Sequence, residues 1–161
     1  MLIPLFTYIT EITRDRLLAI VPWCDIEIVP EMFKYERASR LLSGQPDYVL
    51  DCIDDCHTKG ELIAYCIQSN IKVLTSMGAG GKSDPTRLRI APLNECINDP
   101  LASKIKWKLK KLGVNYEYVM SIFSIEKTVA ELLPLDDEQV KNPQGELEVY
   151  SIHHIICFLR I

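Results

Sequence analysis

The clearest hydrophobic pattern lies in the middle of the chain and predicts a strand, a helix and a second strand. Residues 48–53 form a short apolar run typical of a buried strand, and residues 71–76 form another. Between them, residues 57–69 carry apolar side chains at i, i+1, i+4 and i+5, the spacing of one buried helix face. Those side chains are Leu62, Ile63, Cys66 and Ile67. A strand, helix and strand within about 30 residues make a βαβ unit, which predicts an α/β fold with a partly parallel sheet flanked by helices.

A second helix is predicted after Asp99, which can cap the free N–H groups of a helix that begins with Pro100. Apolar side chains then recur on one face until Gly113, a residue that commonly ends a helix. This stripe consists of Leu101, Ile105, Leu109 and Leu112. Residues 88–91 and 118–124 are the predicted strands on either side of this helix.

The start of the chain predicts one more helix, residues 11–21, which Pro22 ends. Residues 25–29 alternate polar and apolar side chains, as a half-buried strand does. Residues 134–143 are polar and predict a loop.

Composition describes one globular domain. The chain has 161 residues, a net charge of −4, 48% hydrophobic and 25% charged residues, which is enough to bury a core. The acidic balance argues against a protein that coats nucleic acid, DNA included, through bulk charge. The most apolar stretch, residues 149–161, is shorter than the roughly 18 to 20 residues that span a bilayer. Residues 1–9 lack the features of a signal peptide, so we expect an intracellular protein.

The cysteine pattern argues against a zinc site. The chain has six cysteines and three histidines, and no cysteine pair has C-x-x-C spacing. Cys52, Cys66 and Cys157 lie in apolar stretches, where we expect them to pack as small hydrophobic residues. All six are expected to be reduced thiols.

Asp54 and Asp55 follow the first strand of the βαβ unit and are the first candidate site. Ligands of open α/β sheets bind at the carboxyl ends of strands, and a carboxylate tolerates a phosphate there when Mg²⁺ bridges the two. This placement predicts a metal–nucleotide site. The alternative is that Asp55 only caps the following helix and Asp54 is a solvated loop residue.

The loop at residues 78–81, Gly-Ala-Gly-Gly, is the second candidate, because glycines permit close backbone approach to a ligand. It fits neither common phosphate-binding glycine motif, so a tight turn is the competing interpretation.

The third candidate is a run of five lysines within eight residues of the second predicted helix. Its members are Lys104, Lys106, Lys108, Lys110 and Lys111. Such a local positive field could hold RNA phosphates, and an ordinary solvated helix face is the alternative. Trp107 could stack on a base or cover the core, and we expect the core.

Two stretches and one lysine between them resemble the tRNA threonylcarbamoyladenosine dehydratase family. They are Asp-Tyr-Val-Leu-Asp-Cys-Ile-Asp at 47–54, Lys59, and Val-Leu-Thr-Ser-Met-Gly-Ala-Gly-Gly-Lys-Ser-Asp-Pro-Thr-Arg at 73–87. That family belongs to the superfamily of ubiquitin-activating, ThiF and MoeB adenylating enzymes. The resemblance covers about residues 14–140, and it implies a partial Rossmann-like ThiF/MoeB fold.

The resemblance implies an activity and its cofactors. ATP would activate the carboxylate of N6-threonylcarbamoyladenosine in tRNA as an acyl-adenylate, and an internal nitrogen would close a ring and release AMP. Asp54 then corresponds to the superfamily's Mg²⁺ ligand, and Lys59 to a basic residue at the ATP site. A positive surface for tRNA would include Lys104, Lys108 and Lys111.

The chain also departs from the family pattern. The G-x-G-x-x-G loop for the ATP phosphates and the bacterial catalytic cysteine have no counterpart in its 161 residues. We therefore expect residues 1–142 to be an incomplete ThiF-type nucleotide-binding domain. Residues 143–161 do not resemble the family and read as a mistranslated tail.

Other functions remain open at this point. A catalytically inactive relative could bind tRNA or pair with an intact subunit. A sulfur-carrier adenylyltransferase should carry zinc-ligand cysteine pairs, and a dehydrogenase should carry a dinucleotide fingerprint; this sequence has neither. Superfamily members are typically dimeric, so a homodimer is expected. Fungal relatives are anchored at the mitochondrial outer membrane, which makes that location or the cytoplasm the expectation.

Overall fold

The computed structural model describes residues 9–128 and the backbone of residues 156–159. The chain divides into two compact units, residues 1–32 and 33–161, which we describe separately. The first contains α1 (Ile9–Ile20), which agrees with the predicted helix and ends before Pro22. The strand predicted at residues 25–29 is wrong, because these residues have no regular structure. Alternation alone does not make a strand without a neighbouring strand to accept its hydrogen bonds, and the described residues of this unit offer none.

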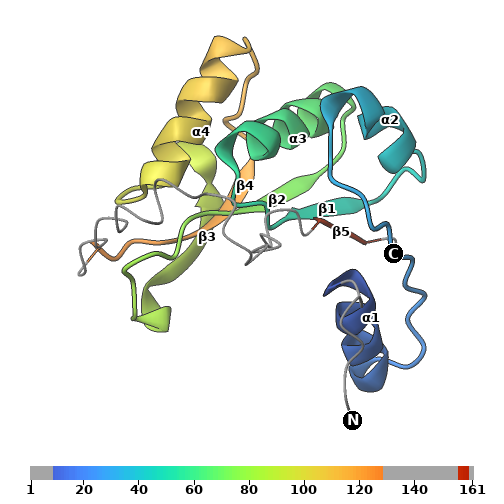
Figure 1. Cartoon of the computed structure of the whole chain (residues 1–161). Coiled ribbons are helices and arrows are strands. Elements are labelled where there is room, and N and C mark those ends of the chain that lie inside the picture. Colours follow the sequence, from blue (N-terminus) through green and yellow to red (C-terminus); the bar gives the residue numbers. More distant parts are fainter. Residues whose placement is uncertain (1–8, 129–155, 160–161) are drawn as a thin grey trace, which may run out of the picture. The chain divides into compact units, whose positions relative to one another are not determined.

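The second unit is built on a five-stranded sheet (Figure 1). Its strands, in spatial order, are β3 (Leu88–Pro92), β4 (Met120–Ser124), β2 (Val73–Ser76), β1 (Tyr48–Asp51) and β5 (Ile156–Leu159). The central pairs β1–β2 and β2–β4 are parallel, whereas the outer pairs β3–β4 and β1–β5 are antiparallel. The predicted partly parallel sheet is therefore confirmed.

Two long helices cover one face of this sheet, α3 (Cys56–Gln68) and α4 (Pro100–Lys111), with the short α2 (Ala38–Leu41) beside α3 (Figure 1). Both long helices begin within one residue of where the sequence places them and end where the backbone turns left-handed. Asn70 has φ 56° and Gly113 has φ 68°, so both predicted helix stops are confirmed. Single 3-10 turns complete the unit: η1 (Tyr35–Arg37), η2 (Pro85–Arg87) and η3 (Leu93–Glu95).

The core lies between these helices and the sheet. Its fully enclosed members include Val49, Ile53, Leu62, Ile63, Ile105 and Leu109. One predicted core position differs: Leu112 is half exposed, because it is the residue that caps the end of α4. No helix in the described part of the chain has the length and apolar character needed to cross a membrane.

Candidate functional site

The parallel strands bring the candidate residues to one edge of the sheet. Because β1, β2 and β4 run in the same direction, their carboxyl ends meet there. Asp54 follows β1, the loop at residues 78–84 follows β2, and Glu126 follows β4. Asp99, at the start of α4, joins them, since a Cβ atom built on Gly78 would lie 3.6 Å from either oxygen of its carboxylate.

A buried polar cluster lies beneath this edge, and we call Asp51, Lys59 and Thr75 the Asp51 cluster. Asp51 and Thr75 are direct partners in the register of β1 and β2, and both point into the interior. The Asp51 carboxylate accepts hydrogen bonds from Lys59 Nζ at 2.8 Å and from Thr75 Oγ1 at 2.6 Å. Lys59 Nζ also donates to Thr75 Oγ1 at 3.2 Å. The cluster thus ties α3 to the two central strands.

The same carboxylate controls the backbone that leads to Asp54. Its second oxygen accepts a hydrogen bond from the Ile53 N–H at 3.0 Å, so the turn after β1 is fixed from inside. Lys59 is 0% exposed. Its expected contact with a cofactor stays a prediction, and the contact that the structure gives it is with Asp51.

Asp54 is the exposed carboxylate at the edge, and no hydrogen bond or ion pair involves its side chain within the described ranges. Asp55 behaves as the alternative interpretation expected, because its side chain caps α3 by accepting from the Thr58 N–H at 2.7 Å. The described residues contain no group of three or more metal-ligating side chains. One accessible carboxylate nevertheless fits Mg²⁺, which proteins usually bind through one or two carboxylates together with substrate phosphates.

The glycine loop after β2 is a tight turn, stabilised by a hydrogen bond within the loop and by hydrogen bonds to Glu126. Gly81 has φ 68°, and the Lys82 N–H donates to the Ala79 carbonyl. Glu126, which is almost fully buried, accepts hydrogen bonds from the N–H groups of Ser83 at 3.1 Å and Asp84 at 2.9 Å. These two donors are therefore engaged by Glu126 and are not presented to a phosphate in this conformation. The turn still borders a hollow of about 210 Å³.

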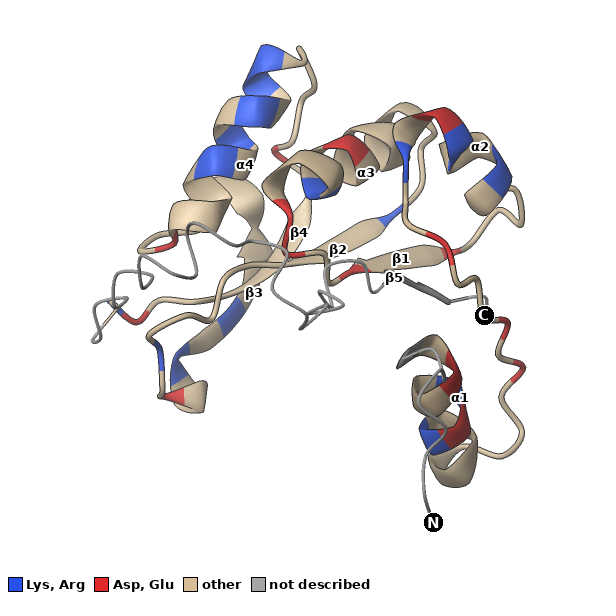
Figure 2. Cartoon of the chain, viewed as in Figure 1, with Lys and Arg blue, Asp and Glu red and all other residues tan. Residues whose placement is uncertain are grey.

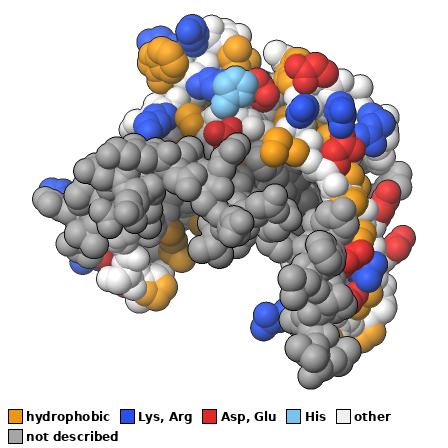
Figure 3. All heavy atoms as spheres, viewed as in Figure 1, with side chains coloured by type: hydrophobic (Ala, Val, Ile, Leu, Met, Phe, Trp, Pro, Cys, Tyr) orange, Lys and Arg blue, Asp and Glu red, His pale blue; other side chains and the backbone are white. Residues whose placement is uncertain are grey.

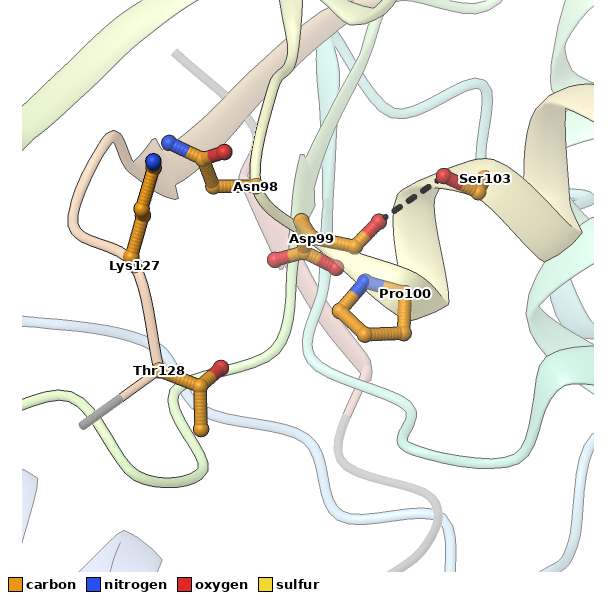
Figure 4. Close-up of a pocket in the computed structure, with 6 residues that line it drawn as sticks. All are labelled: Asn98, Asp99, Pro100, Ser103, Lys127 and Thr128. Atoms are coloured by element: carbon orange, nitrogen blue, oxygen red, sulfur yellow. Dashed lines mark hydrogen bonds between the residues drawn. The ribbon is translucent and has the colours of Figure 1, made fainter. Parts of the chain in front are cut away.

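Asp99 has two roles at the start of α4. One carboxylate oxygen accepts from the Ala102 N–H at 2.9 Å, which confirms the predicted cap. The other oxygen is buried, has no hydrogen bond to any residue that the structure describes, and lies 3.5 Å from Lys82 Nζ. Beside it is an open hollow of about 380 Å³, which Asn98 and Lys127 line from two different segments (Figure 4).

Lysines recur along α4 (Figure 2), and their side chains have two kinds of environment. Lys106 Nζ donates to the Cys96 carbonyl at 2.8 Å, and Lys108 Nζ donates to the His57 carbonyl of α3 at 2.7 Å. The exposed members are Lys104, Lys110 and Lys111. The structure thus separates Lys108 from the other two lysines expected to bind tRNA.

Trp107 corrects the sequence-based expectation that it covers the core. It is 66% exposed, and Lys111 Nζ lies 5.2 Å from the centroid of its ring. Its position opposite the buried side of α4 leaves it no core to cover. Basic and hydrophobic side chains lie together on this part of the surface (Figure 3).

The described cysteines differ sharply in environment. Burial, with a smaller contribution from the Asp51 charge, raises the pKa of the Cys66 thiol to about 12. Burial, followed by the Asp99 charge, raises the pKa of the Cys96 thiol to about 11. Cys52 is exposed, so the expectation that it packs as a hydrophobic residue is wrong, because its strand neighbour Asp51 takes the inward position. Cys157 lies outside the residues whose side chains are described.

Sequence reasoning missed Asp51 and Thr75. The signal was present, because a carboxylate inside an apolar strand requires a buried partner and Lys59 follows it by eight residues. The pairing with Thr75 depended on the strand register, which the sequence pattern did not supply.

A partly parallel sheet with polar residues at its carboxyl edge defines the class of α/β proteins that bind ligands at this edge. Residues 9–130 match the ThiF family. The chain belongs to that family.

Similar proteins are tRNA threonylcarbamoyladenosine dehydratases. Dehydratase 2 of Saccharomyces cerevisiae is 40% identical over 146 residues, which are 88% of this chain and 32% of that protein. The Haemophilus influenzae enzyme is 42% identical over 102 residues, which are 63% of this chain and 39% of that protein. The chain thus spans about a third of the length of these relatives.

Solved structures of the E. coli enzyme, TcdA, have the same fold. Its complex with AMP matches with a TM-score of 0.71 and 34% identity over 80% of this chain and 53% of that one. Its complex with ATP gives the same TM-score at 35% identity, over 74% and 52% of the two chains. These comparisons give no support to a location at the mitochondrial outer membrane.

Proposed function

We propose that this chain takes part in the ATP-dependent dehydration of N6-threonylcarbamoyladenosine in tRNA. The observation that carries the proposal is the exposed carboxylate of Asp54 at the carboxyl edge of a ThiF-family sheet, which pairs with no described residue, in a chain similar to tRNA threonylcarbamoyladenosine dehydratases. The complexes of TcdA with ATP and AMP support an adenylating reaction.

The proposed reaction has two steps that balance. A carboxylate oxygen of the threonyl group attacks the α-phosphorus of ATP, and pyrophosphate leaves. A nitrogen of the same modified base then attacks the activated carbonyl carbon, gives up its proton and expels AMP with one carboxylate oxygen. The net change in the base is the loss of one water and the closure of a ring.

Asp54 and the Asp51 cluster beneath it have separate parts in this proposal. Asp54 would hold Mg²⁺, which supplies charge neutralisation at the phosphates. The Asp51 cluster would keep the turn that presents Asp54 in one conformation, since the Asp51 carboxylate bonds to the Ile53 N–H. Lys59 would then affect ATP binding indirectly, because it holds the Asp51 carboxylate that fixes this turn.

The tRNA would lie on the positive face of α4. Lys104, Lys108 and Lys111 are the proposed contacts, and Lys104 and Lys111 have the exposed side chains. Lys108 would contribute mainly by holding α4 against α3 through its bond to the His57 carbonyl. A second copy of the chain, or an intact related subunit, is the proposed protein partner.

The test uses the protein purified from its own cells, with its intact mass recorded. It is incubated with tRNA bearing N6-threonylcarbamoyladenosine, ATP and Mg²⁺, and the digested nucleosides are analysed by mass spectrometry. We expect the dehydrated nucleoside to form with the wild type and with Glu117→Gln, an exposed carboxylate outside the edge. Asp54→Asn should lose at least ten-fold in rate.

Two results would overturn the proposal. The first is binding of tRNA without any ATP-dependent conversion, which would favour a binding module. The second is an Asp54→Asn variant as active as Glu117→Gln, which would remove Asp54 from the reaction.

A further inference from the structure

Three side chains of α4 make a surface stripe outside the described core. Lys104, Trp107 and Lys111 recur at i, i+3 and i+7, the spacing of neighbours along one helix face. All three are exposed, and we call them the Trp107 stripe.

Among the residues that the structure describes, the indole of Trp107 is not part of the core. The inward side of α4 is already filled by Ala102, Ile105 and Leu109, each 0% exposed. Leaving a large aromatic surface in water gives up about 25 cal/mol for each Å² of apolar area that burial would have removed. A helix face that only contacts water is more stable with a polar side chain at this position.

The charges around the ring point to a polyanion. The chain as a whole carries a net charge of −4, yet the ring is flanked by lysines, and the ammonium of Lys111 lies 5.2 Å from its centroid. Lys106 and Lys108 direct their ammonium groups to protein carbonyls, so the exposed charge concentrates on the stripe and Lys110. Seven helical residues rise about 10.5 Å, which places positive charge on both sides of a single ring.

We propose that the Trp107 stripe binds a single-stranded segment of RNA, with one unpaired base stacked on Trp107 and the flanking phosphates paired with Lys104 and Lys111. An aromatic ring among cations recognises unpaired bases, whose faces are free, whereas bases in a duplex are already stacked on each other. An acidic peptide would satisfy the lysines and leave the ring unused. This inference rests on the proposed function in that it names the part of a tRNA that α4 contacts.

The test measures RNA binding without ATP. Fluorescein-labelled RNA is titrated with the chain and followed by anisotropy, once with a stem-loop that carries an unpaired loop and once with a blunt duplex of equal length. We expect the stem-loop to bind at least ten-fold more tightly. Trp107→Ala should weaken stem-loop binding by about 5- to 150-fold, the range for one stacked base. Trp107→Phe, which keeps an aromatic face, should retain most of the affinity.

Trp23 offers a matched control, because it is the other tryptophan of the chain and is 85% exposed in the first unit. Trp23→Ala should leave stem-loop binding unchanged. In a Trp23→Phe background the remaining fluorescence comes from Trp107, and the stem-loop should quench it with the same midpoint as the anisotropy. Lys104→Gln combined with Lys111→Gln should reduce the slope of log K against log salt by about 1.4, since each single-strand phosphate contact contributes about 0.7.

Four outcomes would overturn the inference. They are equal affinity for duplex and stem-loop, undiminished binding by Trp107→Ala, fluorescence of Trp107 that RNA does not change, and no RNA binding at all. Circular dichroism of each variant separates a lost contact from a lost fold. Failure of the ATP-dependent conversion with stem-loop binding intact would reject the proposed function and leave this inference standing.

Discussion

Two helices lie on the same face of the sheet (Figure 2), and their lysine side chains differ in burial. On α3, Lys59 is fully buried, and its Nζ forms an ion pair with a carboxylate oxygen of Asp51 at 2.8 Å. On α4, Lys104 and Lys111 stand in solvent. The difference is whether a buried carboxylate lies within reach. A lysine next to such a carboxylate becomes part of the interior, and one without it stays available to a partner.

Other lysines fall between these extremes. Lys82 is almost enclosed between the Ser124 carbonyl, at 3.0 Å, and Asp99, at 3.5 Å. Lys108 is partly buried, and its ammonium donates a hydrogen bond to the His57 carbonyl of α3. The effect of removing a lysine charge should therefore decrease in the order Lys59, Lys82, Lys108.

Lys59→Met should have the largest effect on stability. It leaves the Asp51 carboxylate buried without a cation, which typically costs about 3–5 kcal/mol of unfolding free energy. Thermal denaturation followed by circular dichroism measures the loss. Lys104→Met is the matched control, and because its side chain is exposed we expect little change.

A second variant separates charge from packing at this position. Asp51→Asn combined with Lys59→Met removes both charges and keeps an oxygen for the Ile53 N–H, so it should recover much of the lost stability. If the double variant is no more stable than Lys59→Met alone, the buried charge is not the cause of the loss.

Lys82→Met should have an intermediate effect. The Asp99 oxygen that faces Lys82 has no hydrogen bond to a described residue, so removing the ammonium leaves that oxygen uncompensated at a cost of about 1–3 kcal/mol. Urea denaturation compares it with Lys110→Met, an exposed lysine. Equal stability of the two variants would show that Lys82 does not support Asp99.

Gly60→Ala should have the smallest effect, and its sign should depend on Lys108. A Cβ atom on Gly60 would lie 2.7 Å from Cδ of Lys108, so the lysine must move and give up the His57 carbonyl. A Lys108→Ala background removes the methylene groups of this lysine. There, Gly60→Ala should stabilise α3 by about 0.5–1 kcal/mol through helix propensity. The four variants form a double-mutant cycle measured by urea denaturation. A coupling free energy of zero would contradict the contact.

Local patterns predicted most of this fold. Apolar periodicity located α3 and α4, and the caps at Asp55 and Asp99 together with the left-handed stop at Gly113 set their limits. The two failures have the same cause. Whether residues 25–29 form a strand, and whether Cys52 faces the interior, depends on contacts with residues that are distant in the sequence.

The candidate site was less predictable for the same reason. Asp54 could be placed at the edge from the order of strand and helix alone. The enclosure of Lys59, the pairing of Asp51 with Thr75 and the exposure of Trp107 follow from register and helix orientation. The sequence gives the charge of each side chain, but its tertiary neighbours determine whether that side chain is buried in an ion pair or exposed to solvent.

The Asp51 cluster also bears on the order in which the chain can assemble. Its members lie 8, 16 and 24 positions apart in pairs, so one short segment contains them all. The partner of Leu50 in β5, in contrast, is Cys157, roughly a hundred residues later. Each doubling of a loop adds about 0.6 kcal/mol of closure entropy, so the segment of the cluster closes at less entropic cost. Two strands and a helix can be locked together there before distant parts of the polypeptide meet, and the sheet can then grow outward from β1 and β2 on both sides.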